Sequence, residues 1–299
     1  MVYYRKTWQG VIYMIRLMTD TSANLPLSLI EKYNITVLSF HLTVDGKTFP
    51  YSCKTEFDGK TYYDAMRRGA KIQTSMINQS DYGDAFTDAV TSGDDVLFIG
   101  MSGGISGAAR IAVRAAEEVL AAFPGRRIEV IDTYAASLGE GLQVLEAAKL
   151  LESGMGLDEA AEKIRADRAH MCQYFTVDDL AYLQRGGRIS GAAALVGTVL
   201  QIKPVLIGDE TGRIIVSDKV RGRKQSLTYL ADKFAELALD KSAPIGIAHA
   251  DCEESVEFLL TKLRDRGCTG EPMIVMYEPV TGGHVGPGTV ALFFRGAHK

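Results

Sequence analysis

The polar, glycine-rich segment at residues 102–107 is the first whose residue types could bind a ligand. It follows the apolar run at residues 95–100 and precedes a stretch with helical spacing of small apolar residues. Free N–H groups at a helix start attract anions, and glycine lets the backbone approach them closely. Ser102 and Ser106 add hydroxyl donors, although Ser106 could serve only as a helix cap. The segment is therefore predicted to be either an anion site or a structural turn.

Three further polar turns end strand-like segments or precede helix-like ones. They contain Thr74 with Ser75, residues 20–22, and Asp132 with the threonine that follows it. Short hydroxyl and carboxylate side chains cap helices as readily as they contact ligands. Both interpretations stay open for each turn, with capping the ordinary one for Thr74.

Two segments of the second half combine glycine with a residue that can recognise an anion. Arg185 and Arg188 flank a Gly-Gly pair, and arginine forms a fork that fits carboxylate or phosphate. The alternative for these arginines is a solvated loop. His284 lies among the glycines and proline of residues 282–288, which predicts a shaped loop with the ring facing a pocket, or else a structural histidine.

The sequence lacks the motifs of several well-known metal, nucleotide and catalytic sites. His284 has no H-E-x-x-H pattern or second histidine nearby, so no metal is indicated. No Gly-Lys-Ser/Thr follows the turn at residues 102–107, and no G-x-S-x-G elbow occurs. The four cysteines are far apart and form no C-x-x-C pair. We expect no cofactor, no metal and no complete catalytic set.

Composition and charge narrow the class of protein. The chain has 299 residues, 46% of them hydrophobic and 23% charged, which predicts a well-formed core. Its net charge of -4 argues against nucleic acid as a partner. The longest apolar stretch, at residues 192–206, contains Gln201 and Lys203 and is too short and polar to span a bilayer. We expect a soluble protein of the reducing cytoplasm, without membrane insertion.

The first half predicts a parallel α/β domain over residues 1–170. Strand-like runs at residues 11–18, 35–42, 95–100 and 127–132 alternate with helix-like segments, and residues before Met14 extend the chain ahead of the first strand. Strand, turn and helix in succession are typical of a Rossmann-like parallel sheet with crossover helices. Ligands of such sheets bind beyond the carboxyl ends of the strands, where the turn at residues 102–107 lies.

The second half predicts a different α/β domain over residues 171–299. Six short strands are interrupted by two helices, near residues 224–239 and 253–266, which favours a mixed sheet covered by helices. The charged helix at residues 157–169 is a natural boundary, so the junction is expected near residue 170.

Together these segments resemble the DegV family. The resemblance runs in order along the chain, and its most specific parts are the GGRIS and GHVGPG segments. It rests on residues 19–26, Thr74 with Ser75, 102–107, 132–139, 179–190, Lys203 with Pro204, and 283–288. The resemblance implies two α/β domains and a long-chain fatty acid held in a buried tunnel between them. It also implies a separate fatty acid kinase as partner, to which the acyl carboxylate is presented for phosphorylation.

Roles for individual residues follow from the resemblance alone. It implies that hydroxyls of Thr74 and of the glycine-rich turn hold the carboxylate, with Ser106 favoured over Ser102. The implied ligand-binding set is Thr74, Ser102, Ser106, Gly107, Arg188 and His284. Arg221 is the implied contact for a docking kinase.

The sequence also departs from the family pattern around Thr74 and around the turn. Residues 76–80 read Met-Ile-Asn-Gln-Ser where many members have Gln-Pro-Ser, and two alanines follow Gly107 where members often have threonine and an aromatic residue. Two other hypotheses therefore stay open. One is an enzyme acting on a small phosphorylated or carboxylated metabolite, with Asp20 or Asp132 as general base. The other is a lipid-sensing regulatory protein.

Overall fold

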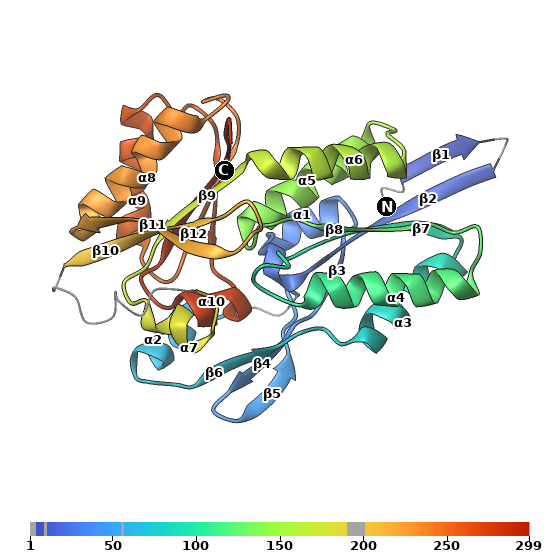
Figure 1. Cartoon of the computed structure of the whole chain (residues 1–299), viewed down its shortest axis with the longest axis horizontal. Coiled ribbons are helices and arrows are strands. Elements are labelled where there is room, and N and C mark those ends of the chain that lie inside the picture. The colour runs from blue at the N-terminus through green and yellow to red at the C-terminus, as the bar shows by residue number, and fades with distance from the viewer. Residues whose placement is uncertain (1–3, 9–10, 55–56, 190–200, 299) are drawn as a thin grey trace.

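Two α/β lobes and a small third sheet make up the protein (Figure 1). The computed structural model describes residues 4–8, 11–54, 57–189 and 201–298. Sheet A and its helices form the N-terminal lobe, and sheet C with its helices forms the C-terminal lobe. Sheet B is a small antiparallel sheet built from residues of the first half. No helix in the described residues is long and apolar enough to cross a membrane.

Sheet A confirms the predicted parallel sheet. Its strands are β1 (Tyr4–Trp8), β2 (Val11–Asp20), β3 (Thr36–Leu38), β7 (Asp94–Gly100) and β8 (Ile128–Asp132). β2 pairs in parallel with β3 and β7, and β7 pairs in parallel with β8. The first predicted strand continues to Asp20, and the residues before Met14 add β1, which pairs antiparallel with β2.

Helices cover both faces of sheet A, as the apolar run of β7 requires. Alternate side chains of a strand point to opposite faces, so Val96 and Phe98 pack on one side and Leu97 and Ile99 on the other. The first face carries α3 (Gln79–Thr91) and α4 (Ala108–Ala122). The second face carries α1 (Leu27–Lys32), α5 (Leu138–Glu152) and α6 (Leu157–Asp167).

Sheet B places Thr74 in a strand rather than at a helix cap. Its strands are β4 (His41–Val44), β5 (Lys47–Pro50) and β6 (Ile72–Ser75), in the order β5-β4-β6. The capping interpretation of Thr74 is wrong, because Asn78 caps α3 by accepting from the N–H of Asp81 at 2.8 Å. The prediction of one continuous strand over residues 35–42 is also wrong. The chain leaves sheet A after β3, buries Phe40, and enters sheet B at β4.

Sheet C confirms the predicted mixed sheet. Its strands are β9 (Met171–Thr176), β10 (Ile202–Gly208), β11 (Ile214–Arg221), β12 (Ile245–His249), β13 (Pro272–Met276) and β14 (Val290–Arg295). Their order is β11-β10-β9-β14-β12-β13, and only β12 and β13 are parallel neighbours within this sheet as described. α8 (Arg223–Leu237) and α9 (Glu253–Asp265) pack on its outer face. β9 begins at Met171, beside the domain junction predicted near residue 170.

The inner face of sheet C meets the first half of the chain. A shared core joins Phe175 and Phe293 of the sheet to Leu138 at the start of α5 and to Tyr63 of α2. The short helices on this side are α2 (Gly59–Arg67), α7 (Ala181–Arg185) and α10 (Pro279–Val285). Single 3-10 turns follow β2 at Thr21–Ala23 and precede β9 at Arg168–His170. Figure 1 shows α2, α7 and α10 grouped beside sheet B, below sheet C.

Candidate binding site between the two lobes

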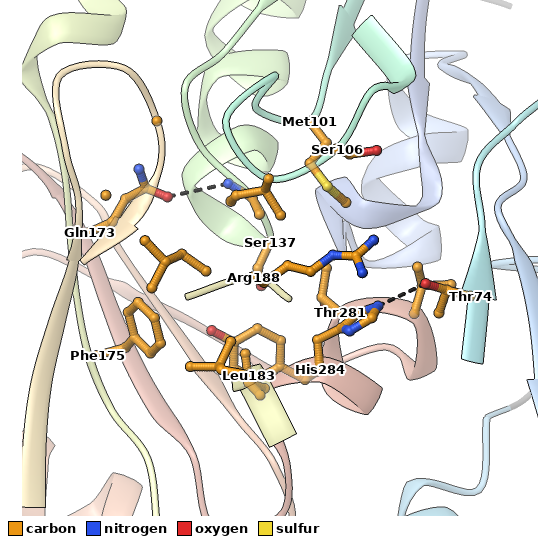
Figure 2. Close-up of a pocket in the computed structure, with 18 of the residues that line it drawn as sticks. Thr74, Met101, Ser106, Ser137, Gln173, Phe175, Leu183, Arg188, Thr281 and His284 are labelled. Atoms are coloured by element: carbon orange, nitrogen blue, oxygen red, sulfur yellow. Dashed lines mark hydrogen bonds between the residues drawn. The ribbon is translucent and has the colours of Figure 1, made fainter. Parts of the chain in front are cut away.

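A cavity of about 80 Å³ lies where the two lobes and sheet B meet. Most of its wall is apolar and comes from both halves of the chain (Figure 2). Its apolar lining includes Phe40, Met76, Met101, Ile105, Ala136, Phe175, Leu183, Ile214, Val280, Val285 and Phe293. Polar side chains interrupt this wall at a few places, among them Thr74, Ser106, Arg188 and His284. The cavity therefore has the character of a site for a mainly apolar molecule with one polar group.

The hydroxyl of Thr74 and the ring of His284 form the most direct polar contact of the cavity. Thr74 Oγ1 lies 2.7 Å from His284 Nε2, and Figure 2 shows this bond crossing from β6 to α10. His284 lies in the helix α10 and not in the loop that the glycine-rich sequence predicts. The loop begins only at Gly286, whose φ of 82° ends the helix. The preceding glycines are needed for packing, since a Cβ on Gly282 would meet the Tyr63 hydroxyl.

A buried carboxylate fixes the start of α10 and so the position of His284. The two oxygens of Glu278 accept from the backbone N–H groups of Val280 and Thr281, each at 2.6 Å. Such N-cap bonds satisfy donors that a helix start leaves free. Burial nevertheless raises the pKa of Glu278 to about 7.

Arg188 lies beside His284 and lowers its affinity for protons. Burial, followed by the positive charge of Arg188, lowers the pKa of His284 to about 4. The imidazole is therefore neutral at pH 7 and can donate or accept through its ring nitrogens. Arg188 is half-buried, burial lowers its pKa too, and its guanidinium donates to the carbonyl of Gly186. Figure 2 shows the guanidinium directed toward Thr74 and His284.

Of the turn at residues 102–107, Ser106 lines the cavity and Ser102 does not. Ser106 Oγ accepts from the N–H of Ala108 at 3.2 Å, at the start of α4, and finds no acceptor for its own proton among the described residues. Ser102 Oγ instead donates to the carbonyl of Gly212 at 2.8 Å and is fully buried. Gly107 also lies outside the lining, close to the Met76 side chain. The turn contributes the Ser106 hydroxyl and the apolar side chain of Ile105 to the cavity, while Ser102 joins the two lobes.

Three polar residues of the lining were not singled out from the sequence. Ser137 starts α5, Thr281 lies in α10, and Gln173 lies in β9. Gln173 bridges the lobes, because its Oε1 accepts from Ala136 N at 3.2 Å and its Nε2 donates to Tyr134 O at 2.9 Å. Ser137 falls within the segment 132–139 that carried the family resemblance, so that signal was present. Gln173 and Thr281 stand in ordinary strand and helix sequence.

Asp20 and Asp132, the general-base candidates, hold backbone turns and do not line the cavity. Asp20 is 1% exposed and accepts from the N–H groups of Ser22 and Met101 at 2.9 and 3.2 Å. Burial raises its pKa. Asp132 accepts from the N–H groups of Gly103 and Tyr134, both at 3.0 Å. Asp20 is too buried to reach a substrate as a general base must, and Asp132 lies outside the cavity wall.

Arg221 lies away from the cavity. It ends β11, its side chain is exposed, and it is not part of the cavity wall. Ser190, the last residue of the GGRIS segment, falls outside the described residues. The described part of the chain also contains no cluster of three or more His, Cys, Asp or Glu side chains that could hold a metal ion.

Fold and site together define a two-lobed α/β protein whose apolar interlobe cavity ends in polar groups. The family model described as an uncharacterised protein of the DegV family matches residues 14–296. A DegV domain-containing protein of Clostridium perfringens is 34% identical over 94% of this chain and 97% of its own length. One of Lactococcus lactis is 34% identical over 93% and 96%. The chain belongs to the DegV family.

Solved structures of this family have the same fold. A DegV family protein from Thermus thermophilus, described by its fatty acid binding, superposes with a TM-score of 0.83 at 31% identity. The match covers 93% of this chain and 98% of that one. The fatty acid binding DegV family protein SAG1342 from Streptococcus agalactiae gives a TM-score of 0.84 at 30% identity, over 94% and 98% of the two chains.

Proposed function

We propose that this protein binds one long-chain fatty acid, with the acyl chain in the interlobe cavity and the carboxylate at Thr74, Ser106, Arg188 and His284. One observation carries the proposal: a mostly apolar cavity has its hydroxyl, imidazole and guanidinium groups gathered at one side. Two solved relatives, at 31% and 30% identity, are both described as fatty acid binding, which supports the same ligand class here.

The apolar wall provides the binding energy for an acyl chain. Each buried methylene contributes about 0.8 kcal/mol, so roughly sixteen carbons supply on the order of 10 kcal/mol before the costs of association. The cavity is narrow, and Met76 and Met101 stand in its wall. Methionine side chains are flexible and repack easily, so they are the groups that we expect to move when the chain enters.

The polar groups remove the penalty that a buried carboxylate would otherwise incur. An ionised carboxylate is costly to bury without hydrogen bonds and a counter-charge. Arg188 supplies the charge, because neutral His284 cannot. Thr74, His284 and Ser106 supply donors at the same place. This arrangement leaves one carboxylate oxygen polarised and accessible, as a phosphoryl acceptor requires.

Co-purified lipid tests the binding proposal. The protein is purified from a bacterial host, extracted with organic solvent, and the extract is analysed by mass spectrometry. We expect about one fatty acid per chain, since the ligand is enclosed. The cavity-filling variant Ala136→Phe should lose most of it, while the exposed-site variant Val113→Phe keeps it. Wild-type protein that carries no fatty acid and binds none on addition would contradict the proposal.

We further propose that the protein is the acyl-carrying partner of a fatty acid kinase and has no catalytic activity of its own. Arg221 supports this, because it is exposed and outside the cavity, as a docking residue must be. With a fatty acid kinase catalytic subunit and ATP, wild-type protein should support acyl phosphate formation. Arg221→Glu should lower that rate at least tenfold at subsaturating protein and leave fatty acid affinity unchanged. Equal rates for both proteins would refute the role of Arg221.

A further inference from the structure

A second cavity reaches the polar groups of the site from outside. This outer cleft has a volume of about 830 Å³ and is lined mainly by α2, β6, α7 and the segment that follows α7. Thr74, Arg188 and His284 line both it and the interlobe cavity. A head group bound at these three residues therefore faces apolar walls on one side and the outer cleft on the other.

Positive charge exceeds negative charge in the outer cleft. Its charged side chains are Arg67, Lys71, Arg185, Arg188 and Asp179. Arg67 is neutralised by ion pairs with two carboxylates outside the cleft, those of Asp64 and Asp251. Asp179 accepts from the N–H of Ala181 at 2.8 Å in the turn before α7. The cleft wall then has three remaining cations, Lys71, Arg185 and Arg188, and one carboxylate, that of Asp179.

Lys71 and Arg185 are the cations that the carboxylate site does not use. Both are exposed, and neither forms an ion pair within the described residues. The Arg185 guanidinium lies 4.5 Å from the centroid of the Tyr182 ring, which orients the group and leaves its N–H edge available. Neither residue lines the interlobe cavity, so a carboxylate held at Thr74 and His284 gains little from them.

We propose that the outer cleft is a subsite for a phosphomonoester dianion carried on the same acyl chain, with Lys71 and Arg185 as its ligands. The inference rests on the proposed function, because the acyl chain must occupy the interlobe cavity. A carboxylate carries one charge, which Arg188 balances. A phosphorylated head group carries about two charges and extends beyond the carboxylate position into the outer cleft, whose wall includes the two further cations.

Paired titrations of two ligands test the subsite. Delipidated protein is titrated with hexadecanoate and with hexadecyl phosphate, which has the same chain and a dianionic head. Exposed ion pairs contribute about 0.2 to 1 kcal/mol each, so Lys71→Gln with Arg185→Gln should weaken hexadecyl phosphate binding roughly two- to thirtyfold. Hexadecanoate binding should change less than about twofold. Arg114→Gln with Lys163→Gln removes the same charge from exposed sites elsewhere and should alter neither affinity.

Each outcome separates the subsite from its alternatives. Binding of hexadecyl phosphate should also fall more steeply with added salt than binding of hexadecanoate, because more charge is paired. Millimolar inorganic phosphate should displace neither ligand, since without the chain it has no anchor; displacement would indicate a site for free phosphate and overturn the proposal. Equal losses for both ligands in the cleft variant would also overturn it. Wild-type protein that binds hexadecanoate but not hexadecyl phosphate refutes the subsite alone, and binding of neither refutes the proposed function as well.

Discussion

At the scale of single residues, the polar part of the site depends on a histidine that burial keeps neutral. Among the four polar residues of the proposed site, which are Thr74, Ser106, Arg188 and His284, only Arg188 is charged at pH 7. Its charge also helps to keep His284 neutral. The 2.7 Å bond to Thr74 fixes the ring through Nε2. Thr74 and His284 are therefore neutral hydrogen-bonding groups of fixed position, and Arg188 supplies the positive charge beside them.

The lowered pKa of His284 predicts how stability depends on pH. The folded-state pKa is about 4 and the unfolded-state value is 6.5. Between these values the unfolded chain binds more protons, so the free energy of unfolding should rise as pH rises from 4 to 6.5 and gain nothing more above it. The contribution is up to about 3 kcal/mol. Urea unfolding of wild-type protein and of His284→Asn across this range measures it as the difference between the two curves.

A difference curve that stays flat from pH 4 to 6.5 would contradict the burial of a neutral ring. A difference that falls with rising pH would mean that His284 is held protonated, beside a carboxylate rather than beside Arg188. Using the difference between variant and wild type removes the contributions of other titrating groups, such as Glu278.

Thr74, Ser106, Arg188 and His284 could be named from the sequence because they lie in short polar or glycine-rich segments that interrupt apolar runs. Ser102 has the same residue type and neighbourhood as Ser106 but faces the other way. Its hydroxyl bonds to Gly212, a residue 110 positions further along the chain. Such a long-range partner leaves no local pattern, so the sequence could not distinguish the two serines.

At the scale of elements, the turn between β7 and α4 positions Ser106 by docking against the turn between β10 and β11. A Cβ on Gly104 would lie 2.6 Å from the backbone carbon of Gly212 and 2.7 Å from the nitrogen of Arg213. Backbone atoms cannot move aside as a flexible side chain can. Gly104 is therefore required for this close approach.

Substitution of Gly104 should consequently destabilise the protein. We expect Gly104→Ala to lower the free energy of unfolding by about 1 to 3 kcal/mol, as overpacking does. Gly83→Ala is the matched control, because Gly83 lies inside α3 with empty space around it. That change should raise stability by about 0.5 to 1 kcal/mol. Urea denaturation of both variants measures these changes in the free energy of unfolding. A Gly104→Ala protein as stable as wild type would contradict the close approach of Gly104 to the backbone of Gly212.

A strand that is buried along its whole length could be predicted from the sequence. A segment whose residues divide between two different sheets could not. β7 has all seven residues buried, and its apolar run indicated a central strand directly. The apolar pattern at residues 35–42 spans two strands that belong to different sheets, and nothing in its composition marks the break at Phe40. His284 was assigned to a loop because glycine disfavours helices. The buried Glu278 cap and the packing of α10 override that preference.

At the scale of the whole molecule, the proposed binding site lies where the two lobes meet. Thr74 and Ser106 come from the first half of the chain, and Arg188 and His284 come from the second. The bonds of Gln173 and of Ser102 cross between the lobes and hold these halves in register. The two fold classes could be predicted from strand and helix order. Their relative placement could not, because it depends on contacts between residues far apart in sequence.

The position of a bound carboxylate is the sharpest test of the proposed binding site. A crystal structure of the protein with hexadecanoic acid measures it. We predict a carboxylate oxygen within about 3.2 Å of Thr74 Oγ1 or a His284 ring nitrogen, with Arg188 alongside and the chain running between the lobes past Phe175. A carboxylate at the opposite end of the cavity, or a fatty acid bound only outside it, would contradict the proposed site.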